Sequence, residues 1–465
     1  MTRPPDIAAY HLPDTTRARE LIVIAEHDGV RALAPALTAT DIGAICRSLT
    51  NAQLQLTRMP VDRVIRAVDE AARRLLDPAE PMRHQALAGI TAITGYAPAM
   101  AALVLDRMAA DWTAEPLREL VEAELGGAAA IESFVRTATG TRARAVAPAL
   151  GIHVLAGNVP GVGVTSVVRA LLVRSAVLAK SAVGEPVLTP VFARLLADAD
   201  ADVGACVAAT WWAGGDCDIE EAVLEHAGMV IHYGSADAIA SLSDRAGTGV
   251  RFGEHVPRIS CAICRPVSGG DYEAAAADVA RAVAIFDQQG CVSPQIVYVI
   301  GSSDDARTFA ARGAAALERI QPELPRGRIS DAEAAAIRDL RTSAEFGAYG
   351  GRTTDLWQGD DMSFTVVLSD DSRFEGTCLN RSLLVKPAAS VHEVIEAARP
   401  FGRLLQTVGL AGFATTDRDD VAIRLTAIGA TRITSIAAMP WPPVTWQHDG
   451  RGPLTELVRW TTLEG

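Results

Sequence analysis

The chain has 465 residues, of which 49% are hydrophobic and 5% aromatic, and it contains 38 glycines. This length exceeds a single simple core, and abundant glycine with few aromatics suits helices packed closely on a sheet, so we expect an α/β enzyme of two or three domains. The formal net charge of −13 argues against a nucleic-acid-binding or anionic-membrane surface.

The cysteines and the N-terminus indicate the compartment. Seven cysteines lie between Cys46 and Cys378 without the spacing of a disulfide framework, as is typical of a reducing environment. Cys261 and Cys264 form a CxxC pair, but the alternation over residues 259–263 indicates a buried strand that carries two core thiols. No signal-peptide core and no membrane-spanning apolar run is present. We therefore expect a soluble, cytoplasmic protein without membrane insertion and without a bound metal.

Residues 1–145 are expected to form a mainly helical region. We expect it to pack on the dinucleotide-binding domain that residues 146–257 are predicted to form. Apolar residues recur at helical spacing through residues 61–75, and Pro60 is placed to open that helix. A second amphipathic stretch covers residues 117–125 and ends at Gly126-Gly127, a typical helix stop. Neither stretch presents residues with an evident chemical role.

Residues 146–257 alternate between short apolar strands and helices. We expect strands at 152–156, 176–179, 207–212 and 229–232, with helices at 164–173, 186–198 and 218–227. This alternation predicts βαβ units, a parallel sheet and a Rossmann-type dinucleotide-binding domain. Nucleotides bind such sheets at the carboxyl ends of the strands.

Residues 258–440 contain a second α/β pattern and are expected to form the catalytic domain. Its predicted strands are 259–264, 296–300, 363–368, 382–386 and 432–436, and its predicted helices are 271–286 and 304–318. Residues 320–360 contain Gly and Pro and are expected to run over the surface. Residues 441–465 are expected to form a C-terminal segment that bridges the domains or serves oligomerisation. The expected architecture is two α/β domains that meet at a cleft.

Cys291 is the first candidate for chemistry. It lies in FDQQGCVSPQIVYVI, between a predicted helix and a strongly apolar strand, where Gly290 and Pro294 impose an irregular turn. Such a turn presents the thiol, and nearby backbone N–H groups can stabilise its thiolate. From this context alone, a nucleophile and a buried structural thiol both remain open.

Two polar residues follow the first strands of the predicted parallel sheet. Asn158, in HVLAGNVPGVGV, can donate its amide to an oxyanion or serve as a turn residue. Lys180 ends the second strand, where it can hold a ribose hydroxyl or a phosphate, or lie solvated in a loop. Gly161 and Gly163 form a GxG, which is short of a full dinucleotide fingerprint.

Further candidates lie near the later strands. Gly234-Ser235 opens a helix whose N–H groups can bind a phosphate, although Ser235 can equally be an ordinary N-cap. Glu254, in RFGEHVPRIS, can act as a general base or be a surface glutamate. His448 and Asp449 are adjacent, so their side chains should point in different directions, and we do not expect them to act as a pair.

The order of AGNVP, AKS, YGS and FDQQGCVSPQ resembles the aldehyde dehydrogenase superfamily, and most of all its acyl-CoA reductase branch, which includes the fatty-acid reductase subunit of bacterial luminescence. The stretches LQTVGLAGF, GATRIT and WQHDGRGPLTELVRW are similar to the same branch. The likeness runs from about residue 150 to the end. It implies an aldehyde-dehydrogenase-like α/β fold, with a Rossmann-type cofactor domain, an α/β catalytic domain and a helical N-terminal region.

The resemblance implies a role for each matched residue. Cys291 would take the acyl group from coenzyme A as an enzyme thioester, and the Asn158 amide would stabilise the oxyanion together with the Cys291 backbone N–H. Hydride from a nicotinamide would then yield the aldehyde. Glu254 lies where the family has its base, although EHVPR departs from the usual glycine-rich motif. The matched cofactor-binding positions are Lys180, Ser181, Gly234, Ser235, Ala156 and Gly157.

Two differences from the family pattern concern the choice of cofactor, and a third concerns hydrolysis of the acyl-enzyme. Val183 stands where NAD-preferring relatives carry an acidic residue, so nothing negative repels a 2′-phosphate and NADP(H) is favoured over NAD(H). The glutamate expected at the nicotinamide ribose, near residues 377–380, is missing. The poor base motif around Glu254 suits a reductase, because hydrolysis of the acyl-enzyme would waste the substrate.

Three functions remain open. The first is reduction of an acyl-CoA, or of an acyl group delivered on a protein, to an aldehyde through an acyl-cysteine. The second is a hydrolytic NAD(P)-dependent aldehyde dehydrogenase, in which Glu254 would activate water. The third is a non-catalytic, acyl-carrying subunit of a reductase complex. The resemblance implies an acyl-CoA substrate, an acyl-activating partner protein and a homo-oligomer, either a dimer or a tetramer.

Overall fold

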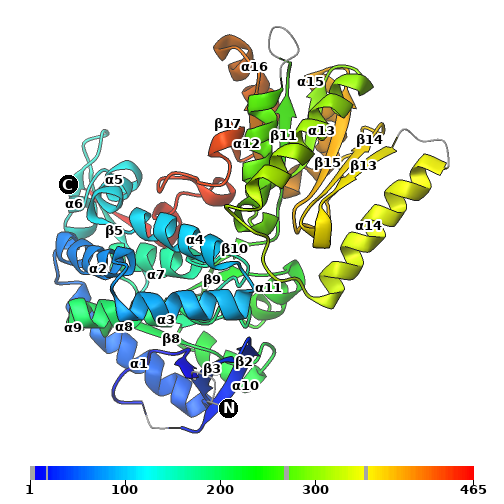
Figure 1. Cartoon of the computed structure of the whole chain (residues 1–465). Helices are drawn as coiled ribbons and strands as arrows, with labels where there is room; N and C mark the ends of the chain where they lie inside the picture. Colours follow the sequence, from blue (N-terminus) through cyan, green and yellow to red (C-terminus); the bar gives the residue numbers. More distant parts are fainter. Residues whose placement is uncertain (1–5, 17–18, 267–271, 350–353, 465) are drawn as a thin grey trace. The chain divides into compact units, whose positions relative to one another are not determined.

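The computed structural model describes residues 6–16, 19–266, 272–349 and 354–464 (Figure 1). The chain divides into two compact units. Unit 1 comprises residues 1–94, 101–256 and 443–465, and unit 2 comprises residues 95–100 and 257–442. Within the described ranges, no helix combines the length and the hydropathy needed to cross a membrane.

The centre of unit 1 is a parallel sheet with the strand order β10-β9-β6-β7-β8. Its strands are β6 (Leu150–Val154), β7 (Ala176–Lys180), β8 (Val207–Thr210), β9 (Met229–Tyr233) and β10 (Arg251–His255). From β6 the chain proceeds to β7 and β8, then crosses to β9 and β10 on the other side, so the strand order reverses between β6 and β9. Ligands bind open parallel sheets at the carboxyl ends of the strands beside such a reversal. The predicted Rossmann-type sheet is confirmed, with β10 as an additional strand.

Helices flank this sheet because each parallel crossover needs one. Right-handed crossovers put the helices before and after the reversal on opposite faces. Among the helices of the N-terminal region, α1 packs beside α10 and α2 packs beside α8. The helices are α1 (Ala39–Leu56), α2 (Val61–Leu76), α3 (Pro81–Gly89), α4 (Pro98–Asp111), α5 (Ala114–Leu125), α6 (Ala129–Glu132), α7 (Val162–Leu172), α8 (Leu188–Ala199), α9 (Ala201–Gly204), α10 (Cys217–Leu224) and α11 (Ala236–Ser243).

The predicted helices of the N-terminal region are confirmed. Helix α2 begins after Pro60, and α5 ends at Gly126, whose φ of 68° is the left-handed conformation that glycine favours. The region also contains short strands that the prediction did not include. β1 (Asp6–Ala8), β2 (Leu21–His27) and β3 (Val30–Pro35) form one small sheet, and β4 (Val135–Arg136), β5 (Arg142–Val146) and β18 (Arg459–Leu463) form another.

Unit 2 is built on a sheet with the strand order β13-β14-β15-β12-β11-β16-β17, in which every neighbouring pair is parallel except β13 with β14. The strands are β11 (Ile259–Cys264), β12 (Pro294–Ile300), β13 (Thr354–Gln358), β14 (Thr365–Ser369), β15 (Ser382–Ala388), β16 (Leu405–Ala411) and β17 (Arg432–Ser435). The five predicted strands are confirmed, and β13 and β16 are additional.

Alternate residues of the central strands enter two different cores, so both faces of this sheet are covered. On β11, Ala262 and Cys264 pack with α12 and α13, whereas Cys261 and Ile263 face α15 and α16. Figure 1 shows α12 and α13 together beside the sheet. Burial on both faces explains the continuous apolar sequence of these strands. The helices are α12 (Glu273–Ala284), α13 (Ser303–Ile320), α14 (Asp331–Tyr349), α15 (Val391–Ala398) and α16 (Thr415–Thr426), with short 3-10 turns η2 (Ile285–Gln288) and η5 (Ile436–Ala438).

Residues 320–360 were predicted to run over the surface, and the described side chains of residues 331–347 are indeed mostly exposed or half-buried, but residues 331–349 form α14, a helix that was not predicted. The helix begins with a capping box, because Ser330 Oγ accepts from Glu333 N at 3.3 Å and the Glu333 carboxylate accepts from Ser330 N at 2.7 Å. Alanines favour the helical state, and the helix is anchored by its own Ile337, whose side chain is fully buried. The Gly and Pro residues of this segment therefore indicate where a helix begins and ends.

Candidate active site

Cys291 lies on the loop between η2 and β12 and is partly exposed. By contrast, Cys46, Cys206, Cys261 and Cys264 are buried, and burial raises the pKa of each thiol, to about 12 for the first three. A thiol that is protonated and enclosed is inert. The predicted core role of Cys261 and Cys264 is confirmed, whereas Cys291 is not enclosed in the core.

The backbone just before Cys291 adopts an unusual conformation. Residues 286–288 have φ values of 59°, 47° and 67°, and residues 379–381 have φ values of 59°, 55° and 60°. The left-handed conformation costs a non-glycine residue roughly 1–2 kcal/mol. Such residues persist only where the surrounding contacts over-determine them, and they gather at functional sites.

Side-chain contacts lock these two runs together. Asp287 Oδ1 accepts from Arg381 Nε at 2.7 Å, and both side chains are buried. Gln288 accepts from Ser382 N and donates to Ser382 O, both at 2.8 Å. The two residues that begin the DQQ of the sequence motif therefore hold the loop in place.

The remaining contacts fix the cysteine itself. Ser260 Oγ donates to the Cys291 carbonyl at 2.6 Å and accepts from Thr407 N at 3.1 Å. Gln289 Nε2 donates to Asn380 Oδ1 at 3.2 Å. A loop held from three directions presents its thiol in one orientation, which is what a preorganised nucleophile needs.

Asn158 lies in unit 1, on the loop that leads from β6 to α7, and is exposed. It follows the strand at which the sheet order reverses. Ala156 and Gly157, just before it, are half-buried. A Cβ at Gly157 would lie 2.9 Å from Ala182 Cβ, so only glycine allows the loops after β6 and β7 to approach this closely.

Lys180 ends β7 at the same edge of the sheet. Its Nζ lies 5.7 Å from the centre of the Trp212 ring, within reach of a cation–π interaction. Burial lowers the pKa of Lys180, and the Glu220 carboxylate partly opposes that shift. Lys180 is therefore a half-buried amine beside an aromatic ring.

Unsatisfied polar atoms gather around this lysine. Four buried side-chain atoms at the ends of β7, β8 and β9 have no hydrogen-bond partner among the described residues: Ser181 Oγ, Thr210 Oγ1, Trp212 Nε1 and His232 Nδ1. Buried polar groups are normally satisfied by protein, water or a ligand. These donors and acceptors, with the cation of Lys180, fit a ligand rich in hydroxyl and phosphate oxygens, such as a nicotinamide dinucleotide.

Gly234 and Ser235 follow β9, on the other side of the reversal. Ser235 Oγ accepts from Ala238 N at 3.2 Å, so its interpretation as an N-cap is confirmed. Glu254 is an exposed residue of β10, and its side chain makes no hydrogen bond or ion pair with any described residue. Its buried neighbours Gly253 and His255 face the other side of the sheet.

A polar cluster at His255 is absent from the sequence-based prediction. His255 Nδ1 lies 2.9 Å from Asp449 Oδ2, and the rings of Tyr233 and His448 stack on His255 with centroid distances of 4.5 and 4.7 Å. His448 Nε2 lies 3.9 Å from Asp449 Oδ2. The expectation that the side chains of His448 and Asp449 point in different directions is therefore wrong, because both lie against the His255 ring.

This cluster is poorly shaped for a metal ion, although its three ligand atoms lie within 4.8 Å of one another. The ring planes of His255 and His448 differ by 7°, so their lone pairs run side by side and do not converge on one point. A pairing that spans 194 residues leaves no local periodic signal, which is why the sequence did not reveal it.

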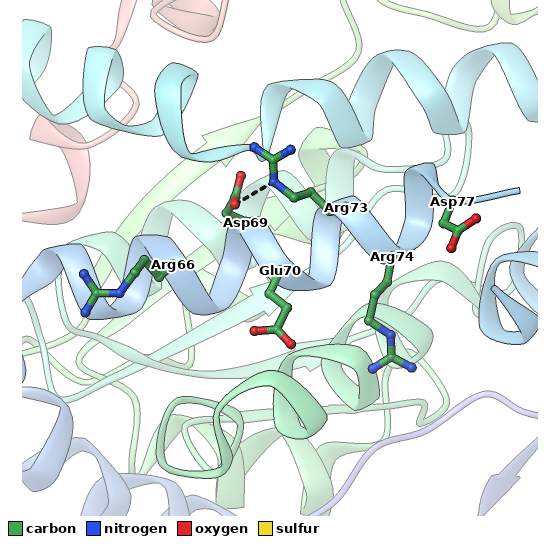
Figure 2. Close-up of a pocket in the computed structure, with 6 residues that line it drawn as sticks. All are labelled: Arg66, Asp69, Glu70, Arg73, Arg74 and Asp77. Carbon is green, nitrogen blue, oxygen red and sulfur yellow. Dashed lines mark hydrogen bonds and ion pairs between the residues drawn. The ribbon is translucent and has the colours of Figure 1, made fainter. Parts of the chain in front are cut away.

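Figure 2 shows a pocket on the surface of α2. Its charged side chains do not form a catalytic or metal-binding cluster. Its lining residues are Arg66, Asp69, Glu70, Arg73, Arg74 and Asp77. Arg73 Nε lies 2.8 Å from Asp69 Oδ2, one turn away, and Arg74 pairs with Glu80 at 2.8 Å. Neighbouring opposite charges neutralise one another here, as on a solvated helix face.

The family described as acyl-CoA reductase (LuxC) matches residues 56–460. The chain belongs to this family. It is thus an enzyme, an oxidoreductase. The long-chain acyl-protein thioester reductase of Photobacterium phosphoreum is 27% identical over 381 residues, which cover 80% of this chain and 74% of the relative. The long-chain acyl-protein thioester reductase 2 of Photobacterium leiognathi is 26% identical over 443 residues, 92% of this chain and 87% of the relative.

The solved structures similar to this chain are aldehyde dehydrogenases. An indole-3-acetaldehyde dehydrogenase complexed with NAD+ has a TM-score of 0.78 at 14% identity, covering 98% of this chain and 96% of that one. The NADP-dependent glyceraldehyde-3-phosphate dehydrogenase of Bacillus halodurans C-125, complexed with NADP, has a TM-score of 0.76 at 15% identity, covering 98% and 99%. The predicted aldehyde-dehydrogenase-like fold is confirmed.

Two differences from the family pattern that the sequence showed, at Val183 and at residues 377–380, can be located in the structure. Val183 is 49% exposed on the loop after β7, three residues beyond Lys180. The segment 377–380 contains no glutamate, and the nearby Glu375 is paired with the buried Lys386 at 2.8 Å.

Proposed function

We propose that this acyl-CoA reductase reduces an acyl thioester to the aldehyde with NADPH, through a covalent acyl group on Cys291. Membership of the family and the names of its relatives support reduction of an acyl thioester. The acyl group comes from coenzyme A or from an acylated partner protein. The chemistry at the thioester is the same in both cases.

The observation that carries this proposal is the setting of Cys291. Cys291 is partly exposed, and the loop that holds it is strained and locked by Asp287 and Gln288. A thiol that only filled space would need neither the strain nor the locking contacts. Strain held at a partly exposed thiol is typical of a nucleophile.

Transfer of the acyl group to Cys291 needs no oxidant or reductant, because one carbon–sulfur bond replaces another. The Cys291 thiolate attacks the thioester carbonyl, a new carbon–sulfur bond forms, and the carbon–sulfur bond to the donor thiol breaks. The negative charge passes from the Cys291 sulfur to the departing sulfur. When bound, the reduced nicotinamide supplies the hydride that converts the acyl group to the aldehyde and returns the Cys291 thiolate.

The other residues take the roles that the family resemblance suggests. The Asn158 amide donates to the oxygen on which negative charge develops. Lys180 and Ser181 hold oxygens of the adenosine part of the cofactor, and the unpaired Ser181 hydroxyl supports this role. Val183 carries no negative charge, so no carboxylate at position 183 repels the 2′-phosphate of NADPH.

The first experiment measures NADPH consumption and aldehyde formation with acyl-CoA of several chain lengths and with an acylated carrier protein. Cys291→Ala should abolish both signals, whereas Cys378→Ala, which removes another partly exposed thiol of unit 2, should keep them. Aldehyde formation by Cys291→Ala at the wild-type rate would overturn the proposal.

The same assay separates the two other functions. A hydrolytic aldehyde dehydrogenase releases fatty acid, and Glu254→Gln would slow that release, whereas we expect aldehyde as the product and little effect of this substitution. A non-catalytic acyl carrier would accept a labelled acyl group on Cys291 and consume no NADPH. The first result would mean that the function is hydrolysis, and the second would mean that it is acyl carriage. In either case the function would not be reduction.

A further inference from the structure

His232 lies near the end of β9, at the carboxyl edge of the sheet of unit 1, and the proposed function gives it no role. The residue is only 6% exposed, yet neither nitrogen of its ring has a hydrogen-bond partner among the described residues. Nδ1 is enclosed by protein, whereas Nε2 is not. Buried polar groups are normally satisfied by protein, water or a ligand. A buried imidazole with an unpaired nitrogen that is open on one side therefore indicates a bound group.

Gly234 keeps Nε2 of His232 uncovered. A Cβ at Gly234 would lie 3.1 Å from Nε2 and 3.9 Å from Ala238 Cβ in the first turn of α11. Without that Cβ, the ring nitrogen and the start of the helix border the same space. Ser235 Oγ accepts from Ala238 N, but the N–H groups before Ala238 have no partner within the helix. Such N–H groups bind phosphate, and Nε2 lies beside them.

The register of the sheet places a basic group on the same face as His232. His232 pairs with Val154 of β6, and Val154 pairs with Lys180 of β7, so the three residues form one row. Residues in one row of a parallel sheet project from the same face, and neighbouring strands lie about 4.8 Å apart, which puts the Cα atoms of His232 and Lys180 roughly 10 Å apart. Val154 between them is half-buried, so protein does not cover the middle of the row completely. A phosphate bound at Nε2 would therefore have the Lys180 amine on its side of the sheet.

His232 acts as a hydrogen-bond donor and not as a cation. Burial and the charge of Lys180 lower its pKa below the ordinary value of 6.5, and the Glu220 carboxylate opposes this shift only in part. The neutral ring carries one hydrogen. Because Nδ1 has no acceptor beside it, that hydrogen is held on Nε2, the nitrogen on the open side. The donor thus points to the space beside Gly234.

The carboxylates near His232 do not occupy this donor. Glu220 is paired with Arg245. Glu254, the register partner of His232 on β10, and Asp237, in the first turn of α11, are both exposed to water, where dissolved ions screen their charges. The position at Nε2 is therefore left for an oxygen of a ligand.

We propose that His232 binds a phosphate of the nicotinamide dinucleotide, with its Nε2–H donating to a phosphate oxygen beside Gly234. The inference rests on the proposed function and deepens it, because it names a residue of the cofactor site that recognises phosphate. NADPH carries one phosphate at the 2′ position of its adenosine and another at the 5′ position. Both present the same oxygen acceptors, and fragments of the cofactor distinguish them.

The test is isothermal titration calorimetry of the full chain with 5′-AMP, 2′-AMP and adenosine. His232→Phe keeps a buried ring and removes both nitrogens. His232→Gln keeps an N–H donor near the position of Nε2, and Gly234→Ala places a Cβ against that nitrogen. His27→Phe, which replaces an exposed histidine of β2 in the same unit, is the matched control.

His232→Phe should weaken the binding of one nucleotide about tenfold, because a hydrogen bond to a charged group is lost, and should leave adenosine binding unchanged. A loss for 5′-AMP identifies the 5′-phosphate as the ligand, and a loss for 2′-AMP identifies the 2′-phosphate. His232→Gln should recover most of the affinity, Gly234→Ala should weaken the same nucleotide, and His27→Phe should match the wild type. The inference is overturned if His232→Phe weakens neither nucleotide, or weakens adenosine as much as the nucleotides. Calorimetry needs neither a thioester nor Cys291, so its result is independent of the Cys291→Ala assay, which tests the proposed function.

Discussion

The ion pair between Asp287 and Arg381 makes the sharpest stability prediction. Arg381 is 0% exposed, and its Nε and Nη1 donate to Asp287 Oδ1 at 2.7 Å and to the Leu324 carbonyl at 2.9 Å. Asp287 also accepts from Gly327 N at 3.0 Å. The pair therefore joins the cysteine loop, the loop before β15 and the end of α13. Replacing Arg381 by methionine keeps much of the volume and removes every one of these donors.

The expected cost follows from what Arg381→Met leaves behind. Asp287 becomes a buried carboxylate with one backbone donor, and breaking a buried pair from one side costs about 3–5 kcal/mol. In a domain of 150–250 residues, 1 kcal/mol shifts Tm by about 2–4 °C. Unit 2 should therefore unfold roughly 6–20 °C lower. Neutralising the carboxylate as well, with Asp287→Asn, should recover part of this loss.

Differential scanning calorimetry of the full chain measures the transition of unit 2 directly. Arg373→Met is the matched control, because Arg373 is an exposed partner of Asp371 in the same unit and such pairs contribute little. Its Tm should stay near that of the wild type. The reasoning is refuted if Arg381→Met and Arg373→Met give the same Tm, or if the second substitution at Asp287 adds its full cost instead of recovering stability.

Three further predictions concern a helix cap, a buried histidine and the cofactor. Thr38→Ala removes the capping box of α1 that Thr38 forms with Asp41, and urea unfolding should show a loss of about 1 kcal/mol; no change would mean that the cap is not needed. Burial lowers the pKa of His153 to about 3, so the unfolded chain binds more protons below pH 6.5 and stability falls as the pH drops through that range. His153→Gln should remove about 2 kcal/mol of the decline between pH 7 and pH 5, and an unchanged slope contradicts this assignment. Val183→Asp should lower the ratio of kcat/KM for NADPH to that for NADH at least about tenfold, because a carboxylate repels the 2′-phosphate; an equal ratio in both proteins argues against the cofactor proposal.

Strong local periodicity allowed most of the architecture to be predicted. Strands that are buried on both faces have continuous apolar sequences, and amphipathic helices repeat their apolar residues every three or four positions. The strands from β6 to β9, together with β11, β12, β14, β15 and β17, were found in this way. The error at α14 has a local cause too, since the capping box of Ser330 and Glu333 was overlooked among nearby Gly and Pro residues.

Pairings between distant residues were not predictable from these patterns. Asp287 and Arg381 are 94 positions apart, and His255 and Asp449 are 194 positions apart. Neither pair has a periodic signature.

Cys291 illustrates which features the sequence determined and which depended on the tertiary structure. The sequence by itself determined that this thiol follows a helix, precedes an apolar strand and sits on a turn between Gly290 and Pro294, because those features depend on neighbours along the chain. Only the tertiary structure decided that residues 286–288 and 379–381 adopt left-handed conformations and that Asp287 and Gln288 lock that turn. Strain and electrostatic fields arise from groups that meet in space, and folding brings those groups together from distant parts of the chain.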